Sequence, residues 1–242
     1  MLNVFARASV SRALAPLGAR LARAGVSADA ITVVGTLGAV GGAVWFYTRG
    51  TFFVGTLVIT FFVLLDLVDG AVARARGGSS KFGALLDSTG DRVADAAVFG
   101  ALLWWFSGPG ASRSLVLACL LCLVLGTLTS YVKARAEGLG LTADVGLAER
   151  AERLIIALAG TGLDGLGVPY VQAVALWLLV GLATITVGQR LAEVRRQSAG
   201  LPTARSGRAG RSDRAGRDRS ARSDGHRSDG ARSAPTPPGG SV

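Results

Sequence analysis

The sequence predicts an all-α membrane protein, in which six transmembrane helices follow an N-terminal interfacial amphipathic helix and both termini are cytoplasmic. Half of its 242 residues are hydrophobic and only 17% are charged. Several apolar runs are long enough to cross a bilayer as helices. The net charge of +10 does not indicate nucleic-acid binding, because nine Arg and four Asp in residues 197–242 account for half of it.

The apolar runs define the expected spans, and glycine, proline and polar residues separate them. Four glycines in the first run would let helices pack closely. Apolar residues at helical spacing in residues 1–25 predict the interfacial helix, with a bend near Pro16. An Arg-rich transit peptide is the alternative for this segment. The expected spans cover residues 28–48, 51–75, 82–106, 113–137, 149–163 and 169–195.

The distribution of basic residues predicts the orientation of these spans. On one side the connections carry only Arg49 and Arg113, whereas the other side holds most of the remaining Lys and Arg. By the positive-inside rule, the richer side is cytoplasmic. The basic residues expected there are Arg74, Arg76, Lys81, Lys133, Arg135, Arg150, Arg153, Arg190, Arg195 and Arg196.

Composition also predicts the domain limits. Residues 197–242 are rich in Arg, Ser, Gly, Asp and Pro, which cannot form a core, so a disordered basic tail is expected there. The helical domain then covers residues 26–196. Cys119 and Cys122 lie inside an apolar run, which favours packed thiols over a zinc or redox site.

Four aspartates interrupt the apolar pattern around one predicted turn. Asp66 and Asp69 are three residues apart, and Asp87 and Asp91 are four apart, so each pair shares a helix face. The Arg-Gly-Gly-Ser-Ser segment between the pairs would fold the two helices side by side. Arg74 cannot offset four carboxylates, so one or two hard divalent cations are expected, Mg²⁺ or Mn²⁺. The alternative is that the aspartates cap helices or pair with arginines at the membrane surface.

The full spacing is Asp66-x2-Asp69-Gly70-x2-Ala73-Arg74-x8-Gly83-x3-Asp87-x3-Asp91. It resembles, without a gap, the signature of the CDP-alcohol phosphatidyltransferases, and the wider resemblance covers roughly residues 1–195. It implies a membrane enzyme that moves the phosphatidyl group of CDP-diacylglycerol to an alcohol while CMP leaves. Two Mg²⁺ ions, or Mn²⁺, would be held by the four aspartates, and Asp91 would also accept the proton of the attacking hydroxyl. Members of this family are typically homodimers.

The same resemblance implies a site for the nucleotide-lipid. Gly70 would let the nucleotide approach the backbone, and Arg74 would reach a phosphate. If the aspartates were absent, close helix packing would explain Gly70 and a surface charge would explain Arg74. Ser80 and the start of the first span are also implied as contacts. That start comprises Asp29, Ala30, Ile31 and Thr32, of which Asp29 and Thr32 could instead cap the helix.

Outside the signature, the segments SYVKARAEGLG and ERAERLII resemble the phosphatidylinositol phosphate synthases of actinobacteria. That subfamily implies myo-inositol 1-phosphate as the acceptor, and its phosphate needs a cationic pocket. The candidates for this pocket are Lys133, Arg135, Arg153 and Arg190. Charges that only fix the topology are the alternative for the same residues. Asp95, one turn beyond Asp91, is expected to pair with a polar neighbour.

Two other functions stay open at this point. Phosphatidylglycerophosphate synthases usually have Asp-Pro-Leu-Ala-Asp-Lys around the second pair, where this chain has Asp87-Ser-Thr-Gly-Asp91-Arg92. A divalent-cation transporter would also use intramembrane acids, but it would place them at mid-membrane and on several helices.

Overall fold

The computed structural model describes residues 15–200, and every regular element in that range is helical. A first helical segment covers residues 15–23. Residues 1–14 and 201–242 hold much of the predicted interfacial helix and basic tail and lie outside the described part, so those domain limits stay predictions. The later elements are α2 (Ala28–Phe46), η1 (Tyr47–Arg49), α3 (Phe52–Ala75), α4 (Lys81–Ser107), α5 (Arg113–Gly138), α6 (Arg150–Asp164) and α7 (Val171–Ala199).

The predicted helix limits are confirmed to within a few residues, because local sequence signals set most of them. Ser27, Ser80 and Ser112 cap α2, α4 and α5, each accepting a hydrogen bond from a backbone N–H of the first turn. Gly50 ends η1 with a φ of +73°, a conformation that glycine adopts without strain. At its C-terminal end, α7 continues to Ala199, past the predicted limit at residue 195.

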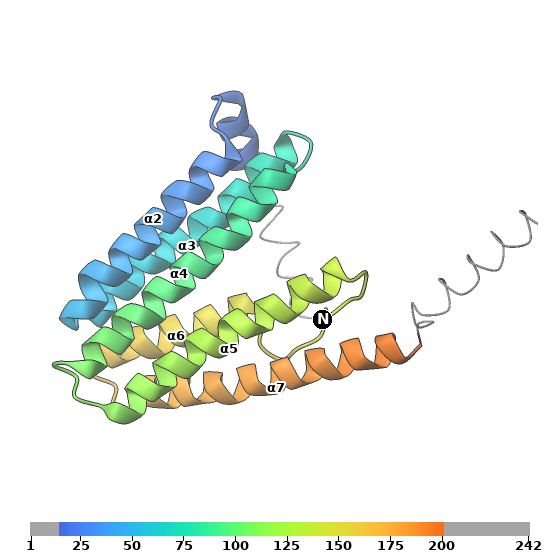
Figure 1. Ribbon diagram of the computed structural model, residues 1–242. Coiled ribbons are helices and arrows are strands. Elements are labelled where there is room, and N and C mark those ends of the chain that lie inside the picture. The colour runs from blue at the N-terminus through green and yellow to red at the C-terminus, as the bar shows by residue number, and fades with distance from the viewer. Residues whose placement is uncertain (1–14, 201–242) are drawn as a thin grey trace, which may run out of the picture. The chain divides into compact units, whose positions relative to one another are not determined.

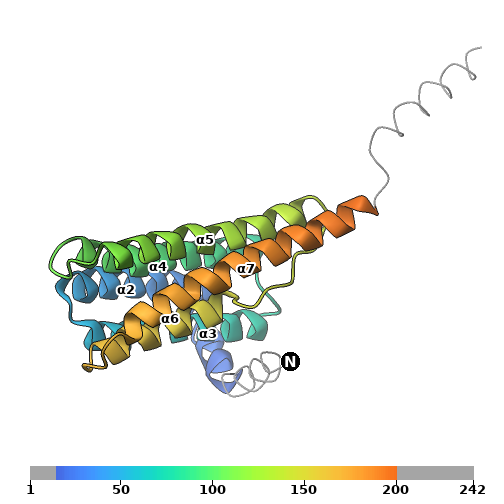
Figure 2. The same cartoon turned by 90° about the horizontal axis from the view of Figure 1, so that it is seen from below.

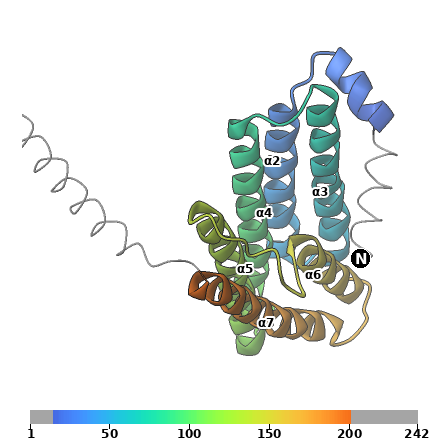
Figure 3. The ribbon, with the colours of Figure 1, turned by 90° about the vertical axis from the view of Figure 1, so that its right-hand side faces the viewer.

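The helices form two groups. In the first, α2, α3 and α4 lie side by side, with α2 in contact with both neighbours (Figure 1 and Figure 3). The second group, α5, α6 and α7, lies at an angle to the first (Figure 1), and α5 runs alongside α4 (Figure 2). Contacts between α4 and α5 and between α3 and α6 join the two groups. The α3–α4 turn and the helix at residues 15–23 lie at one end of the first group (Figure 3).

Four of these helices are long and apolar enough to cross a membrane, judged over the described residues. α4 does not qualify because its first half carries several charged side chains, and α6 is only 15 residues long. The all-helical class is therefore confirmed, and the apolar helices indicate a multi-pass membrane protein. The count of six spans stays a prediction. The qualifying helices are Ala28–Arg49, Phe52–Ala75, Arg113–Gly138 and Val171–Ala199.

The outer faces of the helices are unusually apolar for a protein in water. Leu37, Phe61 and Val174 are each at least 60% exposed, and many other large apolar side chains share this exposure. A soluble monomer does not present so much apolar surface, whereas helices surrounded by lipid do. Between the helices, the core includes the fully buried Phe99 and Leu102 of α4.

The two cysteines belong to this core. Cys119 and Cys122 are free and buried on α5. The Cys122 thiol donates a hydrogen bond to the carbonyl of Leu176 on α7, with 3.5 Å between sulfur and oxygen. The prediction of packed thiols is confirmed, and these residues help to join α5 to α7.

Candidate active site

The predicted turn between α3 and α4 is confirmed, and it follows from the residues at positions 76–80. The two helices are not packed directly side by side, because α2 is the helix that contacts both of them. Gly77 and Gly78 have φ values of +96° and +123°, in a region that side chains with a Cβ rarely adopt. Ser80 then caps α4 by accepting a hydrogen bond from the Gly83 N–H at 2.8 Å. The turn thus brings the signature residues of both helices to one end of the first helix group.

A cleft of about 300 Å³ opens between the start of α2, the C-terminal half of α3 and the first turns of α4. Most residues that the signature placed at a metal or nucleotide site line it. Ala30 and Ile31 are not among the lining residues, and the side chain of Ala30 is exposed. The predicted site residues in the lining are Asp29, Thr32, Asp69, Gly70, Ser80 and Asp87.

Thr32 connects α2 to the first aspartate pair. Asp69 is only 7% exposed, and its Oδ2 accepts a hydrogen bond from the Thr32 hydroxyl. A second contact of that hydroxyl is the Ala28 carbonyl, at 3.2 Å. The alternative in which Thr32 or Asp29 caps α2 is wrong, because the capping side chain is that of Ser27. Thr32 instead fixes a carboxylate in the cleft.

The signature glycines make room for charged side chains. A Cβ at Gly70 would lie 3.2 Å from Nη1 of Arg74, so the guanidinium lies directly over this position. At Gly83 a Cβ would lie 2.8 Å from Oδ1 of Asp29, closer than two such atoms approach in proteins. Gly83 therefore allows a carboxylate of α2 to reach the first turn of α4. Arg74 itself is exposed and lies outside the cleft lining.

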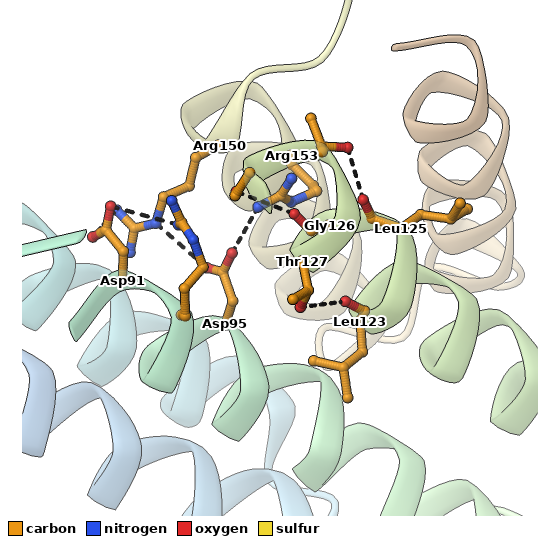
Figure 4. A network of polar contacts seen from close by, with 11 residues as sticks. Asp91, Asp95, Leu123, Leu125, Gly126, Thr127, Arg150 and Arg153 are labelled. Carbon is orange, nitrogen blue, oxygen red and sulfur yellow. Dashed lines mark hydrogen bonds and ion pairs between the residues drawn. The ribbon is translucent and has the colours of Figure 1, made fainter. Parts of the chain in front are cut away.

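Asp91 lies one turn beyond Asp87, and α6 provides its cationic partner (Figure 4). Nη1 of Arg150 lies 2.7 Å from Oδ1 of Asp91, and Nη1 of Arg92 lies 3.8 Å from Oδ2. The prediction that Asp95 pairs with a polar neighbour is confirmed. Its Oδ2 accepts a hydrogen bond from Nη2 of Arg153 at 2.7 Å, and its Oδ1 lies 3.5 Å from Nε of Arg150.

The donor groups of the cleft suit a hard divalent cation, because the carboxylates of Asp69 and Asp87 face one space. The backbone of Asp66 lies in α3, but its side chain lies outside the described part of the chain. Among the side chains that are described, no three His, Cys, Asp or Glu groups are gathered closely enough to hold a metal. The described residues therefore supply part of the predicted ligand set.

Two of the predicted acceptor cations, Arg153 and Arg190, are buried among the second group of helices. Arg190 is 4% exposed and donates to two carbonyls, with Nη1 2.7 Å from Thr129 O and Nε 2.9 Å from Val145 O. Arg153, 2% exposed, lies within electrostatic range of Arg190. The structure thus brings these two guanidinium groups into one region and ties Arg190 to the loop at residues 139–149.

The other two predicted cations lie at the C-terminal end of α5. Arg135 is exposed. Lys133 forms an ion pair with Asp144 of the following loop and lies 3.9 Å from a carboxylate oxygen of Glu137. The hydrogen bond from Lys133 holds the pKa of the Asp144 carboxyl below its usual range. The ammonium group of Lys133 is therefore already paired with an acidic side chain.

Sequence reasoning missed the partnership of Arg150 with Asp91. It treated Arg150 as one of many cytoplasmic charges, although two patterns pointed to a pairing between helices. Asp91 and Asp95 are four residues apart on α4, and Arg150 and Arg153 are three apart on α6. Such spacings place each pair on one helix face. An acidic face on one helix and a basic face on another could therefore have been predicted to pair with each other.

Comparison with known proteins agrees with the signature. Residues 26–187 match the family model described as CDP-alcohol phosphatidyltransferase. This chain belongs to the CDP-alcohol phosphatidyltransferase family. The match covers well over half of the chain and includes the whole hairpin, so the resemblance inferred from the aspartate spacing is confirmed, and with it the class of enzyme.

Curated relatives within this CDP-alcohol phosphatidyltransferase family share much of the sequence. The phosphatidylinositol phosphate synthase of Streptomyces avermitilis is 50% identical over 206 residues, which cover 82% of this chain and 84% of that relative. The protein of the same name from Mycobacterium marinum is 48% identical over 188 residues, covering 76% and 80% of the two chains.

Solved structures in the same family share the fold. The crystal structure of Mycobacterium tuberculosis phosphatidylinositol phosphate synthase with CDP-DAG bound has a TM-score of 0.72 and 46% sequence identity, and covers 76% of this chain and 94% of that one. The same enzyme in complex with manganese and citrate has a TM-score of 0.71 and 46% identity, covering 75% and 88%. These structures are similar to the present chain over its helical domain.

Proposed function

We propose that this chain is a phosphatidylinositol phosphate synthase of phospholipid biosynthesis. It would transfer the phosphatidyl group of CDP-diacylglycerol to myo-inositol 1-phosphate and release CMP. The observation that carries this proposal is that relatives of this name match most of the chain at up to 50% identity. The complete aspartate signature on one helix hairpin supports the same chemistry.

The nucleotide-lipid is assigned to the cleft between α2, α3 and α4. Asp29, Thr32, Gly70 and Ser80 line this cleft, and Arg74 lies against Gly70 at its side. The exposed guanidinium of Arg74 would supply a cation to a diphosphate, and the bare backbone of Gly70 would let the diphosphate approach closely. We also assign Ala30 and Ile31 here, as neighbours of the lining residues on α2.

Two Mg²⁺ ions, with Mn²⁺ as the alternative, are assigned to Asp66, Asp69, Asp87 and Asp91. The carboxylates of Asp69 and Asp87 in one cleft support this, as does manganese in the structure of a relative. When bound, the metal would neutralise charge on the phosphate oxygens and on the leaving CMP. Thr32 would keep Asp69 in its ligating orientation.

The transfer step uses Asp91 as the proton acceptor. The acceptor hydroxyl oxygen attacks the phosphorus attached to diacylglycerol, and the bond from that phosphorus to the bridging oxygen of the diphosphate breaks. CMP leaves with the bridging oxygen and the electron pair, and the hydroxyl proton passes to Asp91. Arg150, 2.7 Å from Asp91, would keep the carboxylate facing the acceptor.

The phosphate of the acceptor is assigned to the cations Lys133, Arg135, Arg153 and Arg190. Arg153 and Arg190 lie within electrostatic range of each other, although the carboxylates of Glu149 and Asp144 act more strongly on Arg190. A phosphate near both guanidinium groups would be attracted by each of them. Lys133 would exchange its bond to Asp144 for a bond to the phosphate. A guanidinium already fixed by backbone carbonyls, as in Arg190, loses little freedom when it binds a phosphate.

The same proposal includes the setting of the enzyme. We assign six spans in the cell membrane, with both termini and the active site on the cytoplasmic side, and a homodimer. The basic ends of α3, α5 and α7 support this orientation.

A purified, detergent-solubilised enzyme would test this function directly. It would be supplied with CDP-diacylglycerol, Mg²⁺ and one acceptor at a time: myo-inositol 1-phosphate, myo-inositol or glycerol 3-phosphate. CMP release together with a phosphatidylinositol phosphate product, from the first acceptor only, is expected. Preference for glycerol 3-phosphate would make the chain a phosphatidylglycerophosphate synthase. Mg²⁺ flux into liposomes without CMP release would indicate a transporter.

A further inference from the structure

Four charged side chains form a continuous chain between α4 and α6 (Figure 4). In order they are Arg153, Asp95, Arg150 and Asp91, with alternating charge, and they are called here the α4–α6 charge chain. The two carboxylate oxygens of Asp95 face different arginines: Oδ2 lies 2.7 Å from Arg153 and Oδ1 lies 3.5 Å from Arg150. Arg150 then reaches Asp91 at 2.7 Å.

The position of the α4–α6 charge chain is not one that would be expected if it served only to stabilise the fold. Arg150 and Arg153 lie in the first turn of α6, where a cation opposes the helix dipole. Asp95 and Arg153 are 7% and 2% exposed, and a buried ion pair is often no more stable than apolar side chains of similar volume. A role in the reaction would account for this placement.

The space around Arg153 is also shaped for it. Gly126 of α5 faces its guanidinium, and a Cβ at that glycine would lie 3.1 Å from Cζ and 3.2 Å from Nε. The arginine is therefore held between a carboxylate on one helix and a bare backbone on another. This leaves its orientation dependent on Asp95, the residue to which it donates a hydrogen bond.

We propose that Asp95 is a positioning residue that couples acceptor binding to the proton acceptor, through Arg153 on one side and Arg150 on the other. Arg153 is thereby held ready for the acceptor phosphate, and Arg150 holds the Asp91 carboxylate at the acceptor hydroxyl. The proposal rests on the proposed function for the roles of Asp91 and Arg153. Asp95 touches no reacting atom, and its effect passes entirely through the two arginines.

The Asp95→Asn variant tests this proposal, because it keeps the volume of the side chain and removes its charge. We expect kcat to fall by roughly 10- to 100-fold, since a misplaced reacting group costs about that much. The KM for inositol phosphate should rise about tenfold through the loosened Arg153. The KM for CDP-diacylglycerol should not change. The matched control is Asp164→Asn, at the opposite end of α6, which should leave all three values unchanged.

A double-mutant cycle separates positioning from a general loss of structure. If Asp95 acts through Arg150, then Asp95→Asn combined with Arg150→Gln should lower kcat no further than the more damaging single change. Additive losses, equal shifts in both KM values, or an Asp95→Asn enzyme with wild-type kinetics would each overturn the proposal. If the Asn variant is not recovered folded, Asp95→Glu should show the same division of effects in weaker form. Wild-type kinetics in that variant, or equal shifts in both KM values, would also overturn the proposal.

A binding measurement without CDP-diacylglycerol provides a readout that does not depend on turnover. Myo-inositol 1-phosphate should raise the Tm of the wild type and of Asp164→Asn, and raise that of Asp95→Asn much less. An equal rise in Asp95→Asn would overturn the proposed link to acceptor binding. If the wild type instead turns over another alcohol, the proposed function fails, and the same division of KM and kcat effects is then measured with that alcohol.

Discussion

The cleft of the first helix group and the cationic region of the second are built in different ways. Around the cleft, Asp69, Asp87, Gly70 and Gly83 come from a single hairpin, and α2 adds a hydroxyl and a carboxylate at its rim. The cationic region instead depends on contacts between helices that are distant in the sequence, such as the bond from Arg153 to Asp95.

The difference predicts how the two regions respond to mutation. Thr32 and Asp69 are buried, but Asp29, Ser80 and Asp87 in the same cleft are at least partly exposed. Changes at these three residues should alter binding or chemistry with limited effect on folding. Arg153 and Arg190 are almost fully buried and hold helices and a loop together. Their loss should alter acceptor binding and stability at once, because a charged or polar partner is left unpaired.

The largest expected effect is the fall in kcat when the assigned proton acceptor, Asp91, is replaced. Asp91→Asn should lower kcat by about 10²- to 10⁴-fold, the usual contribution of a positioned general base. Most binding of CDP-diacylglycerol should remain, because the cleft lining and the other three assigned metal ligands are unchanged. Steady-state kinetics and a direct binding assay on the purified variant would check both statements. Near wild-type turnover would contradict the assignment of Asp91.

A smaller effect is expected for the acceptor cation Arg153. Arg153→Ala should raise the KM for inositol phosphate about 10- to 100-fold, because a charge-assisted bond contributes roughly 1.5–3 kcal/mol. It should also lower the free energy of unfolding by about 3–5 kcal/mol, since Asp95 loses its buried partner. Arg153→Lys is the matched control and should recover part of both losses.

Kinetics with each substrate varied in turn, together with thermal unfolding, would separate the two effects of Arg153→Ala. Unchanged KM values in a destabilised enzyme would mean that Arg153 is only structural. A change in the KM for CDP-diacylglycerol alone would place this arginine at the nucleotide.

Replacing Asp144 should change the KM for inositol phosphate in the opposite direction to Arg153→Ala, and by a smaller factor. Under the proposed assignment of Lys133 to the acceptor phosphate, its ion pair with Asp144 would compete with that phosphate. Asp144→Asn should then lower the KM for inositol phosphate by about two- to fivefold, as expected for an exposed pair. Because Lys133 lowers the pKa of Asp144, this carboxyl stays ionised from neutral pH into the mildly acidic range. The fall in KM should therefore be present at pH 7 and should fade only in acid. A rise in KM at pH 7 would show that Asp144 helps to bind the acceptor.

No loss of activity is expected from removing the C-terminal tail. Residues 201–242 hold almost no large apolar side chain, so they cannot contribute a packed core. A truncated enzyme that ends at residue 200 should keep the kcat and both KM values of the full chain. A large fall in kcat would assign the tail a role in the reaction.

The sequence predicted the cleft better than it predicted the cationic region, and distance along the chain explains why. The aspartate spacing and the Arg-Gly-Gly-Ser-Ser turn are local patterns, so the turn between α3 and α4 could be predicted from neighbouring residues. The cap at Ser80 is equally local, but only the structure revealed it. Arg153 and Asp95 are 58 residues apart, and Arg190 and Thr129 are 61 apart. No spacing rule in a single sequence connects such positions.

Two details of the cleft also needed the structure. The hydroxyl of Thr32 holds Asp69, which is 37 residues away in the sequence, and this contact was not among the roles predicted for Thr32. Gly83 belongs to the signature, but only the structure explains why a glycine is needed there, because the carboxylate of Asp29 lies where a Cβ would be. Both features depend on how α2 packs against the hairpin, which the sequence alone does not specify.

The division of the site into two regions can be tested most directly with one pair of glycine variants. Gly83→Ala places a Cβ 2.8 Å from Asp29 in the cleft, and Gly126→Ala places one 3.1 Å from Arg153 in the cationic region. Gly181→Ala is the control, because a Cβ there meets no atom within 4 Å. Alanine itself favours a helix over glycine by about 1 kcal/mol, so the control should fold at least as well as the wild type.

The decisive measurement is the KM for each substrate in these three variants. The account predicts that Gly83→Ala raises only the KM for CDP-diacylglycerol, that Gly126→Ala raises only the KM for inositol phosphate, and that Gly181→Ala changes neither. If Gly83→Ala and Gly126→Ala both raised the same KM, the assignment of the two substrates to two separate regions would be wrong.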